Sequence, residues 1–237
     1  MKKILGLLLA LCMLLSGVAF AETAEVEAPA LQQNLVILFT SDVHCGVESG
    51  FGYEGLAMIR DNLKAQGNHV LLVDNGDSIQ GEPMGTLTEG EANIKLMNAV
   101  GYDVATIGNH EFSGYRSYEP AIQQFLKYLR LPEGMEKPTD LPYYDTWIND
   151  FHFIVLGNTV YEPGVRATIG DDQYDWLEEK LGEATDDRPI FLFMHQGMKN
   201  TVSGTAESEK WWGINDDAKL RQLLQVQARQ IPTGFPP

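Results

Sequence analysis

The sequence predicts an α/β fold with a mainly parallel sheet and helices packed on its outside. Short apolar runs, which have the length and content of buried strands, alternate with stretches whose apolar residues recur at helical spacing. This alternation starts near residue 35 and continues to about residue 227. Strands that alternate with helices in this way are typical of parallel sheets covered by helices.

The first half of the pattern contains three predicted strands and three predicted helices. The strands are 35–40, 70–73 and 104–107. The helices contain Leu56, Ile59 and Leu63, then Ile94, Met97 and Val100, then Ile122, Phe125, Leu126 and Leu129. Because glycine readily adopts the left-handed conformation that ends a helix, Gly67 and Gly101 mark the ends of the first two.

The second half resumes the pattern after a gap. Residues 131–150 contain three prolines and are predicted to form a long connection. Strands are then predicted at 151–156 and 190–194, and a helix has Tyr174, Leu177 and Leu181 on one face. A last helix is predicted from about residue 216 to 227.

The first 21 residues are typical of a secretory signal peptide. Two lysines precede an apolar run over residues 4–15, and small residues then lead to a cleavage position after Ala21. We therefore expect export to the periplasm or the extracellular space. No stable membrane anchor is expected, because the run is shorter than the ~20 residues that a spanning helix needs. Residues 22–33 are predicted to form an acidic linker, and residues 34–237 a single domain.

Charge and cysteine content exclude several classes of protein. The 237-residue chain has 17 basic and 33 acidic residues and a formal charge of −16, so it would repel the phosphates of a nucleic-acid polymer. A charged fraction of only 21% and an aromatic content of 10% argue against intrinsic disorder. Cys45 is the single cysteine beyond the expected cleavage position, which excludes an internal disulfide in the mature chain.

Polar side chains follow four of the predicted strands where each strand ends. They are Asp42 and His44, Asp77, Asn109 and His110, and His195. The carboxyl ends of parallel strands share one edge of a sheet, so we expect these side chains to gather there. Oxygen and imidazole donors without thiolate suit zinc, manganese or iron. An extended Asp-x-His segment directs both donors to the same side, and a carboxylate such as Asp77 can bridge two ions.

These segments resemble the successive motifs of the calcineurin-like metallophosphoesterases. The motifs are Asp42-Val43-His44, Gly76-Asp77-Ser78, Gly108-Asn109-His110-Glu111 and the isolated His195. Residues 35–112 most resemble the bacterial 5′-nucleotidases, and the chain from about Pro142 onward is more similar to acid-phosphatase-like members. The resemblance implies a metallophosphoesterase-type α/β sandwich with mainly parallel or mixed sheets and helices outside.

The resemblance also implies a role for each polar residue. Asp42 and His44 would bind one metal ion, Asn109 and His195 would bind a second, and Asp77 would bridge the two. His110 would be the catalytic residue, donating to the phosphoryl group or to the leaving oxygen. The implied cofactors are two divalent ions of manganese, zinc or iron, and the implied substrate is a small phosphate ester attacked by a metal-activated hydroxide.

The sequence departs from the family pattern in two places. The 5′-nucleotidases usually have an Asp three residues after the catalytic His, where this chain has Ser113. The family motif Gly-His-x-His, which supplies one imidazole to each metal, has no counterpart after His195. His69 and His152 precede their strands, so we expect them at the opposite end of the sheet as exposed or capping residues. Cys45 is expected to be a core thiol, or one that lies just behind the metal ligands.

Two functions therefore stay open at the level of sequence. The first is an exported, metal-dependent phosphoesterase that hydrolyses a small phosphorylated substrate. The second is a C-terminally truncated relative that is catalytically impaired or inactive, with a residual binding role or none. The missing Gly-His-x-His motif is the feature that separates them.

We predict low metal occupancy for this chain, because each ion would lack one protein ligand that the family motif supplies. Water or Asp74 would have to fill the open coordination positions. Elemental analysis of the purified protein after dialysis measures the occupancy. Two tightly retained ions per chain would contradict the prediction.

Overall fold

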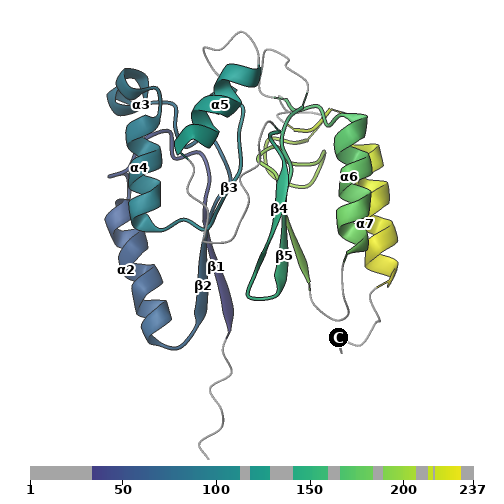
Figure 1. Cartoon of the computed structure of the whole chain (residues 1–237), viewed down its shortest axis with the longest axis horizontal. Coiled ribbons are helices and arrows are strands. Elements are labelled where there is room, and N and C mark those ends of the chain that lie inside the picture. The colour runs from purple at the N-terminus through teal and green to yellow at the C-terminus, as the bar shows by residue number, and fades with distance from the viewer. Residues whose placement is uncertain are drawn as a thin grey trace, which may run out of the picture. The chain divides into compact units, whose positions relative to one another are not determined.

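Two three-stranded sheets form the centre of the fold, and helices lie on their outer sides (Figure 1). The computed structural model describes residues 34–112, 118–128, 141–159, 166–183, 189–206, 213–215 and 217–230. The expected signal peptide and linker, Ser113 and the residues after 230 lie outside this description. None of the described helices is long and apolar enough to cross a membrane.

The first sheet has the order β1-β2-β3 and is entirely parallel. Its strands are β1 (Leu35–Thr40), β2 (His69–Asp74) and β3 (Val104–Ala105). All three were predicted, but β3 is two residues shorter than expected. The Thr106 N–H still donates to the Asp74 carbonyl of the neighbouring strand. The Gly108 N–H donates to the Glu111 carboxylate instead, so the strand does not continue to this residue.

The second sheet has the order β4-β5-β6, with β4 antiparallel to β5 and β5 parallel to β6. Its strands are β4 (Tyr144–Ile148), β5 (Phe151–Val155) and β6 (Ile190–Phe193). The prediction that residues 131–150 form a connection is wrong at residues 144–148, which form strand β4. All three prolines precede this strand, and Asn149 and Asp150 both have positive φ, as in the tight turns that join hairpin strands.

The five predicted helices are present, and two short elements were not predicted. The helices are α2 (Gly52–Ala65), α3 (Pro83–Thr88), α4 (Glu91–Val100), α5 (Tyr118–Tyr128), α6 (Asp171–Gly182) and α7 (Ala218–Gln230). The unpredicted elements are α3 and the 3₁₀ turn η1 (His110–Phe112). Gly101 ends α4 in the left-handed conformation, with φ of 86°.

An apolar cluster between the two sheets holds them together. Leu71 and Val73 of β2 pack with Phe153 and Val155 of β5, and all four are buried. Burial of such side chains stabilises the fold by roughly 2 kcal/mol each. This packing brings the residues that follow β6 close to the residues that follow β2.

Candidate metal centre

The loop after β1 runs alongside the loop after β2 and carries Asp42 and His44. The N–H groups of Asp42, His44 and Cys45 donate to the carbonyl groups of residues 76–78 at 2.9–3.0 Å. These three donors have positive φ values of 56°, 48° and 59°. The expectation of an extended Asp-x-His segment is therefore wrong, because the chain turns here. The two side chains still meet, with 4.0 Å between Asp42 Oδ1 and His44 Nε2.

The buried Glu111 carboxylate binds the loop after β2 to the loop after β3. Its Oε2 accepts the N–H groups of Asp77 and Gly108 at 2.8 and 2.7 Å, and its Oε1 accepts those of Ser78 and Ile79 at 2.9 and 3.1 Å. Burial and the charge of Asp77 raise the pKa of Glu111, while these N–H groups oppose the shift. Sequence reasoning assigned Glu111 no role, although its position in the motif at residues 108–111 offered a signal.

Two glycines permit the close approach of these loops. A Cβ on Gly108 would lie 2.1 Å from Asp77 Oδ1, which is closer than any van der Waals contact allows. Gly76 has φ of 93°, and a Cβ there would lie 2.7 Å from the Gly108 nitrogen. Any larger side chain at either position would push Asp77 away from its partners.

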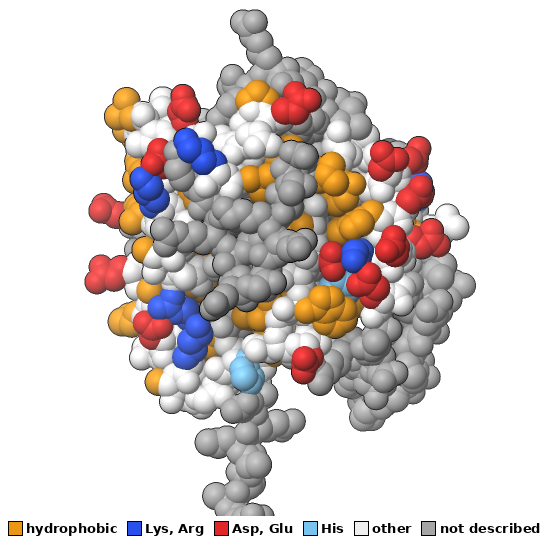
Figure 2. All heavy atoms as spheres, viewed as in Figure 1, with side chains coloured by type: hydrophobic (Ala, Val, Ile, Leu, Met, Phe, Trp, Pro, Cys, Tyr) orange, Lys and Arg blue, Asp and Glu red, His pale blue; other side chains and the backbone are white. Residues whose placement is uncertain are grey.

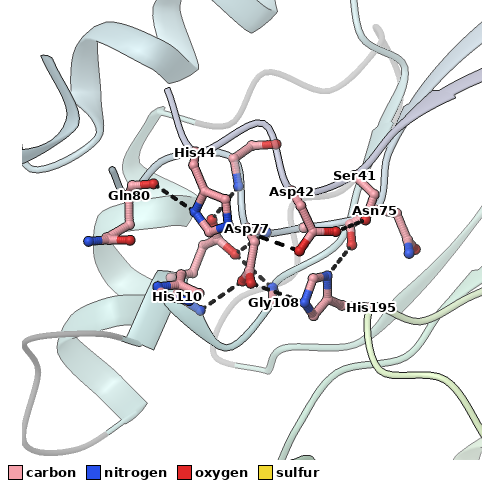
Figure 3. Close-up of polar contacts among 12 residues, drawn as sticks. Ser41, Asp42, His44, Asn75, Asp77, Gln80, Gly108, His110 and His195 are labelled. Atoms are coloured by element: carbon pink, nitrogen blue, oxygen red, sulfur yellow. Dashed lines mark hydrogen bonds and ion pairs between the residues drawn. The ribbon is translucent and has the colours of Figure 1, made fainter. Parts of the chain in front are cut away.

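Asp77 belongs to two overlapping groups of possible metal ligands. One group contains His44, Asp77 and His110, and the other contains Asp42, Asp77 and His195; in each group the donor atoms lie within 4.8 Å of one another (Figure 3). Asp77 is buried, its Oδ1 accepts the His110 N–H at 2.7 Å, and its Oδ2 lies 3.1 Å from His195 Nε2. The Asp77 carboxylate is therefore close to the other donor atoms of both groups.

His195 reaches this centre from the second sheet. Its Nδ1–H donates to the Asn75 carbonyl at 2.7 Å, which leaves Nε2 facing Asp77. Burial alone would lower the pKa of His195, but its hydrogen bond to Asp77 and the charge of that carboxylate outweigh burial and raise the pKa to about 9. Burial would raise the pKa of Asp77, yet His195 holds it below its usual value. Without metal, the two residues form an ion pair.

His44 and His110 are arranged edge to face, with 4.7 Å between their ring centroids. His44 Nδ1–H donates to the Gln80 carbonyl at 3.2 Å, which orients the ring (Figure 3). Asn109 is half-buried beside His110, and its backbone carbonyl accepts the Phe112 N–H at 3.3 Å. The metal-binding role of the Asn109 side chain stays a prediction.

Asp74 and Cys45 are two buried residues close to the candidate ligands in the sequence. The Asp74 carboxylate accepts hydrogen bonds from Thr40, Ser78 and the Gly76 N–H, and burial raises its pKa to about 7. With both oxygens engaged, Asp74 joins neither group of donor atoms. Cys45 is buried, which agrees with the expectation of a core thiol. Burial raises the pKa of its thiol to about 11.

The other two histidines take no part in the centre. His69 is exposed at the start of β2, as predicted. The prediction of an exposed or capping residue is wrong for His152, which is buried near the start of β5. Its Nε2 lies 2.9 Å from Asp145 Oδ2, and its ring stacks on Trp147 at 4.3 Å between centroids. The antiparallel strand β4, absent from the predicted elements, supplies both partners.

Comparison with known proteins identifies the family. Residues 35–225 match the model of the calcineurin-like phosphoesterase family. The chain belongs to this family. Its fold also resembles that of a Staphylococcus aureus protein described as a 5′-nucleotidase candidate, with a TM-score of 0.50 and 19% identity over 84% of this chain and 44% of that one.

Relatives with known names include several 5′-nucleotidases. The UshA protein of Escherichia coli is 29% identical over 73% of this chain, and a 5′-nucleotidase of Vibrio cholerae is 36% identical over 41% of it. The chain spans 33% of the length of the first and 19% of the second. The predicted resemblance to the family and to its 5′-nucleotidases is thus confirmed.

The donor set fits divalent metal ions. Each group combines carboxylate oxygen with imidazole nitrogen, and neither contains a thiolate, so zinc, manganese and iron are all suitable. The sharing of Asp77 by the two groups matches the requirement of a bridging carboxylate.

We predict that Glu111→Gln lowers the free energy of unfolding by about 3 kcal/mol, because its amide nitrogen would face backbone N–H groups that have no other acceptor. Urea denaturation measures the loss. Glu178→Gln, an exposed substitution on α6, is the matched control and should change stability by under about 0.5 kcal/mol. Equal effects of both substitutions would contradict the role of Glu111.

A second prediction concerns the stability of the metal-free protein at alkaline pH. The pKa of His195 is about 9 in the folded state and 6.5 when unperturbed, so its protonation stabilises the fold fully below pH 6.5. This contribution, about 3 kcal/mol, is lost as the pH rises through 9. Denaturation of the chelator-treated protein from pH 6 to pH 10 should show the loss, and His195→Gln should lack it. The same pH dependence in both proteins would refute the assignment.

Proposed function

We propose that this chain carries an exported, metal-dependent phosphoesterase activity that hydrolyses small phosphate esters. The single observation that carries the proposal is the position of Asp77 in two adjoining groups of donor atoms. Family membership supports the reaction class, since the family is described as calcineurin-like phosphoesterase. Export is proposed from the signal-peptide pattern of residues 1–21.

The proposed ligands divide between two ions around one carboxylate. Asp42, His44, Asp77, Asn109 and His195 would hold the ions, with Asp77 between them. Two divalent cations would lower the pKa of a shared water and neutralise charge on the phosphoryl oxygens. The protein orients its own donors through hydrogen bonds, such as those from His44 to Gln80 and from His195 to Asn75.

His110 is the proposed catalytic residue. Its ring meets His44 edge to face, and its backbone N–H is bound to Asp77, which fixes the start of the 3₁₀ turn beside the ligands. An imidazole nitrogen can carry a proton and deliver it to a leaving oxygen. This placement supports a proton donor on the side of the centre next to His44.

Nucleoside monophosphates are the first substrate class to test. Named relatives from Vibrio cholerae and from the venom of Gloydius brevicauda are 5′-nucleotidases, and the latter is 35% identical over 43% of this chain. These proteins are much longer than this chain, so the substrate class is carried here as a proposal and compared with simpler esters.

We predict hydrolysis of p-nitrophenyl phosphate, its bis-ester or AMP by the purified chain with added manganese or zinc. Asp77→Asn should lower kcat/KM at least about 100-fold, the scale of loss when a key electrostatic group leaves an active site. The Asn amide oxygen can still accept the His110 N–H, so circular dichroism should show an intact fold.

Asp175→Asn is the matched control, because Asp175 is exposed on α6 and belongs to neither group of ligands. It should retain the activity of the parent protein. Folded parent protein without hydrolysis of any of the three esters, under any of the metals, would refute the proposed activity and leave a catalytically inactive relative.

A further inference from the structure

A further group of possible metal ligands lies in the second sheet and the helix that covers it. It contains Asp145 of β4, His152 of β5 and Glu183, which follows α6, and their donor atoms lie within 4.8 Å of one another. The Lys180 ammonium lies among them, 2.8 Å from Glu183 Oε1 and 3.5 Å from Asp145 Oδ1. We call these four residues the Asp145 cluster.

Strand register and helix packing bring the Asp145 cluster together. His152 is paired across the hairpin with Trp147, which lies two residues along β4 from Asp145. Because side chains two residues apart in a strand share a face, Asp145 and His152 lie on the same face of the sheet. Ile154 of β5 also lies on that face and packs with Leu181 of α6. The end of α6 therefore lies over this face and supplies the other two members of the cluster.

The Asp145 cluster is separate from the candidate metal centre around Asp77. His152 is level with Ile190, at the start of β6, whereas His195 follows the end of that strand. A strand rises about 3.3 Å per residue, so the length of β6 alone sets the two histidines roughly 10 Å apart. The members of the cluster belong to neither group of ligands around Asp77. A cation bound here would therefore be additional to the ions of the candidate centre.

His152 presents a buried imidazole nitrogen to the cluster. Its side chain is 2% exposed, and its ring stacks on Trp147 with 4.3 Å between the centroids, which holds the ring in place. Its Nε2 lies 2.9 Å from Asp145 Oδ2. Its Nδ1 is buried and has no hydrogen-bond partner in the part of the chain that the structure describes. The polar contact of the ring is thus directed at the cluster, and Nε2 is the nitrogen that can bind a cation.

Negative charge exceeds positive charge in the cluster. Two carboxylates face one ammonium, and the hydrogen bond to Glu183 and the charge of Asp145 raise the pKa of Lys180, so it stays charged. The Glu183 side chain is 37% exposed, which leaves the cluster open to solvent on that side. Figure 2 shows acidic side chains around a basic one on the side of the molecule where α6 lies. A divalent cation in place of the ammonium would balance both carboxylates.

We propose that the Asp145 cluster is a zinc-binding site that cross-links the β4-β5 hairpin to the end of α6. One imidazole and two carboxylates are ligands that zinc commonly takes, and water would complete its coordination. Ligand atoms of a tetrahedral zinc ion lie roughly 3.3 Å apart, since each is about 2 Å from the ion. The donor atoms of the cluster are therefore near the required spacing before any ion binds. This site does not depend on the proposed phosphoesterase activity.

Zinc binding exchanges one cation of the cluster for another. The zinc ion takes the lone pair of His152 Nε2, the ring proton moves to Nδ1, and the Lys180 ammonium withdraws toward solvent. A buried N–H at Nδ1 without an acceptor reduces the affinity. We therefore expect zinc to bind in the micromolar range and to be lost on dialysis.

Equilibrium dialysis of the chelator-treated full chain against micromolar zinc tests the proposal. His152→Gln should remove one zinc site, and Glu183→Gln, at a partly exposed position where the fold is expected to persist, should weaken it at least about tenfold. Lys180→Gln should tighten it about fivefold, because the competing ammonium is gone. Lys219→Gln is the matched control, since Lys219 pairs with Asp171 outside the cluster, and it should leave zinc binding unchanged.

Trp147 distinguishes the cluster from the candidate centre around Asp77. Cobalt(II) accepts the same ligands as zinc and quenches a nearby indole, so cobalt should quench the fluorescence of Trp147, which stacks on His152, and zinc should reverse the effect. Trp147→Phe should lack this signal. Glu183→Gln should need at least about tenfold more cobalt, whereas Glu178→Gln, an exposed substitution on the same helix, should behave like the parent.

Three results would overturn the proposal. The first is the same cobalt dependence in the parent protein and in Glu183→Gln, and the second is zinc that fails to reverse the quenching. The third is calcium that displaces cobalt more readily than zinc does, because the cluster would then select a cation that prefers oxygen ligands.

Discussion

The Glu111 carboxylate is the interaction on which the candidate centre depends. Four backbone N–H groups from two loops converge on its two oxygens, and all of them are shielded from water. Each would cost about 1–3 kcal/mol if left without an acceptor. Because the Asp77 N–H is one of these donors, its hydrogen bond to Glu111 fixes the backbone from which the shared carboxylate extends. An acidic side chain that belongs to neither ligand group thus holds the backbone of the shared ligand Asp77.

The second constraint is the packing of the two sheets. His195 follows β6, whereas Asp77 follows β2, and the buried cluster of Leu71, Val73, Phe153 and Val155 holds those sheets face to face. Without metal, the charges of Asp77 and His195 compensate each other at 3.1 Å. A cation that binds here must displace the proton of His195, so its affinity rises with pH. The packing of the two sheets, the protonation of His195 and the binding of a cation are therefore linked through Asp77 and His195.

Periodicity was enough to predict most of the fold, since β1, β2, α4 and α6 lie where their apolar residues indicated. The strand β4 escaped prediction because Tyr-Asp-Thr-Trp-Ile shows only a weak alternation, and its partner is needed to reveal it. The positive φ values of Asp42 and His44 also escaped, since no glycine marks them. The role of Glu111 depends on contacts with residues 77–79, more than 30 positions earlier, which no local pattern encodes.

The distribution of charge links the candidate centre to the way a substrate would be held. The chain carries a formal charge of −16, with 33 acidic and 17 basic residues. An anionic phosphate ester therefore gains no attraction from the general field of the protein. Its attraction must come from cations bound at Asp77 and its neighbours, or from contacts to the uncharged part of the molecule.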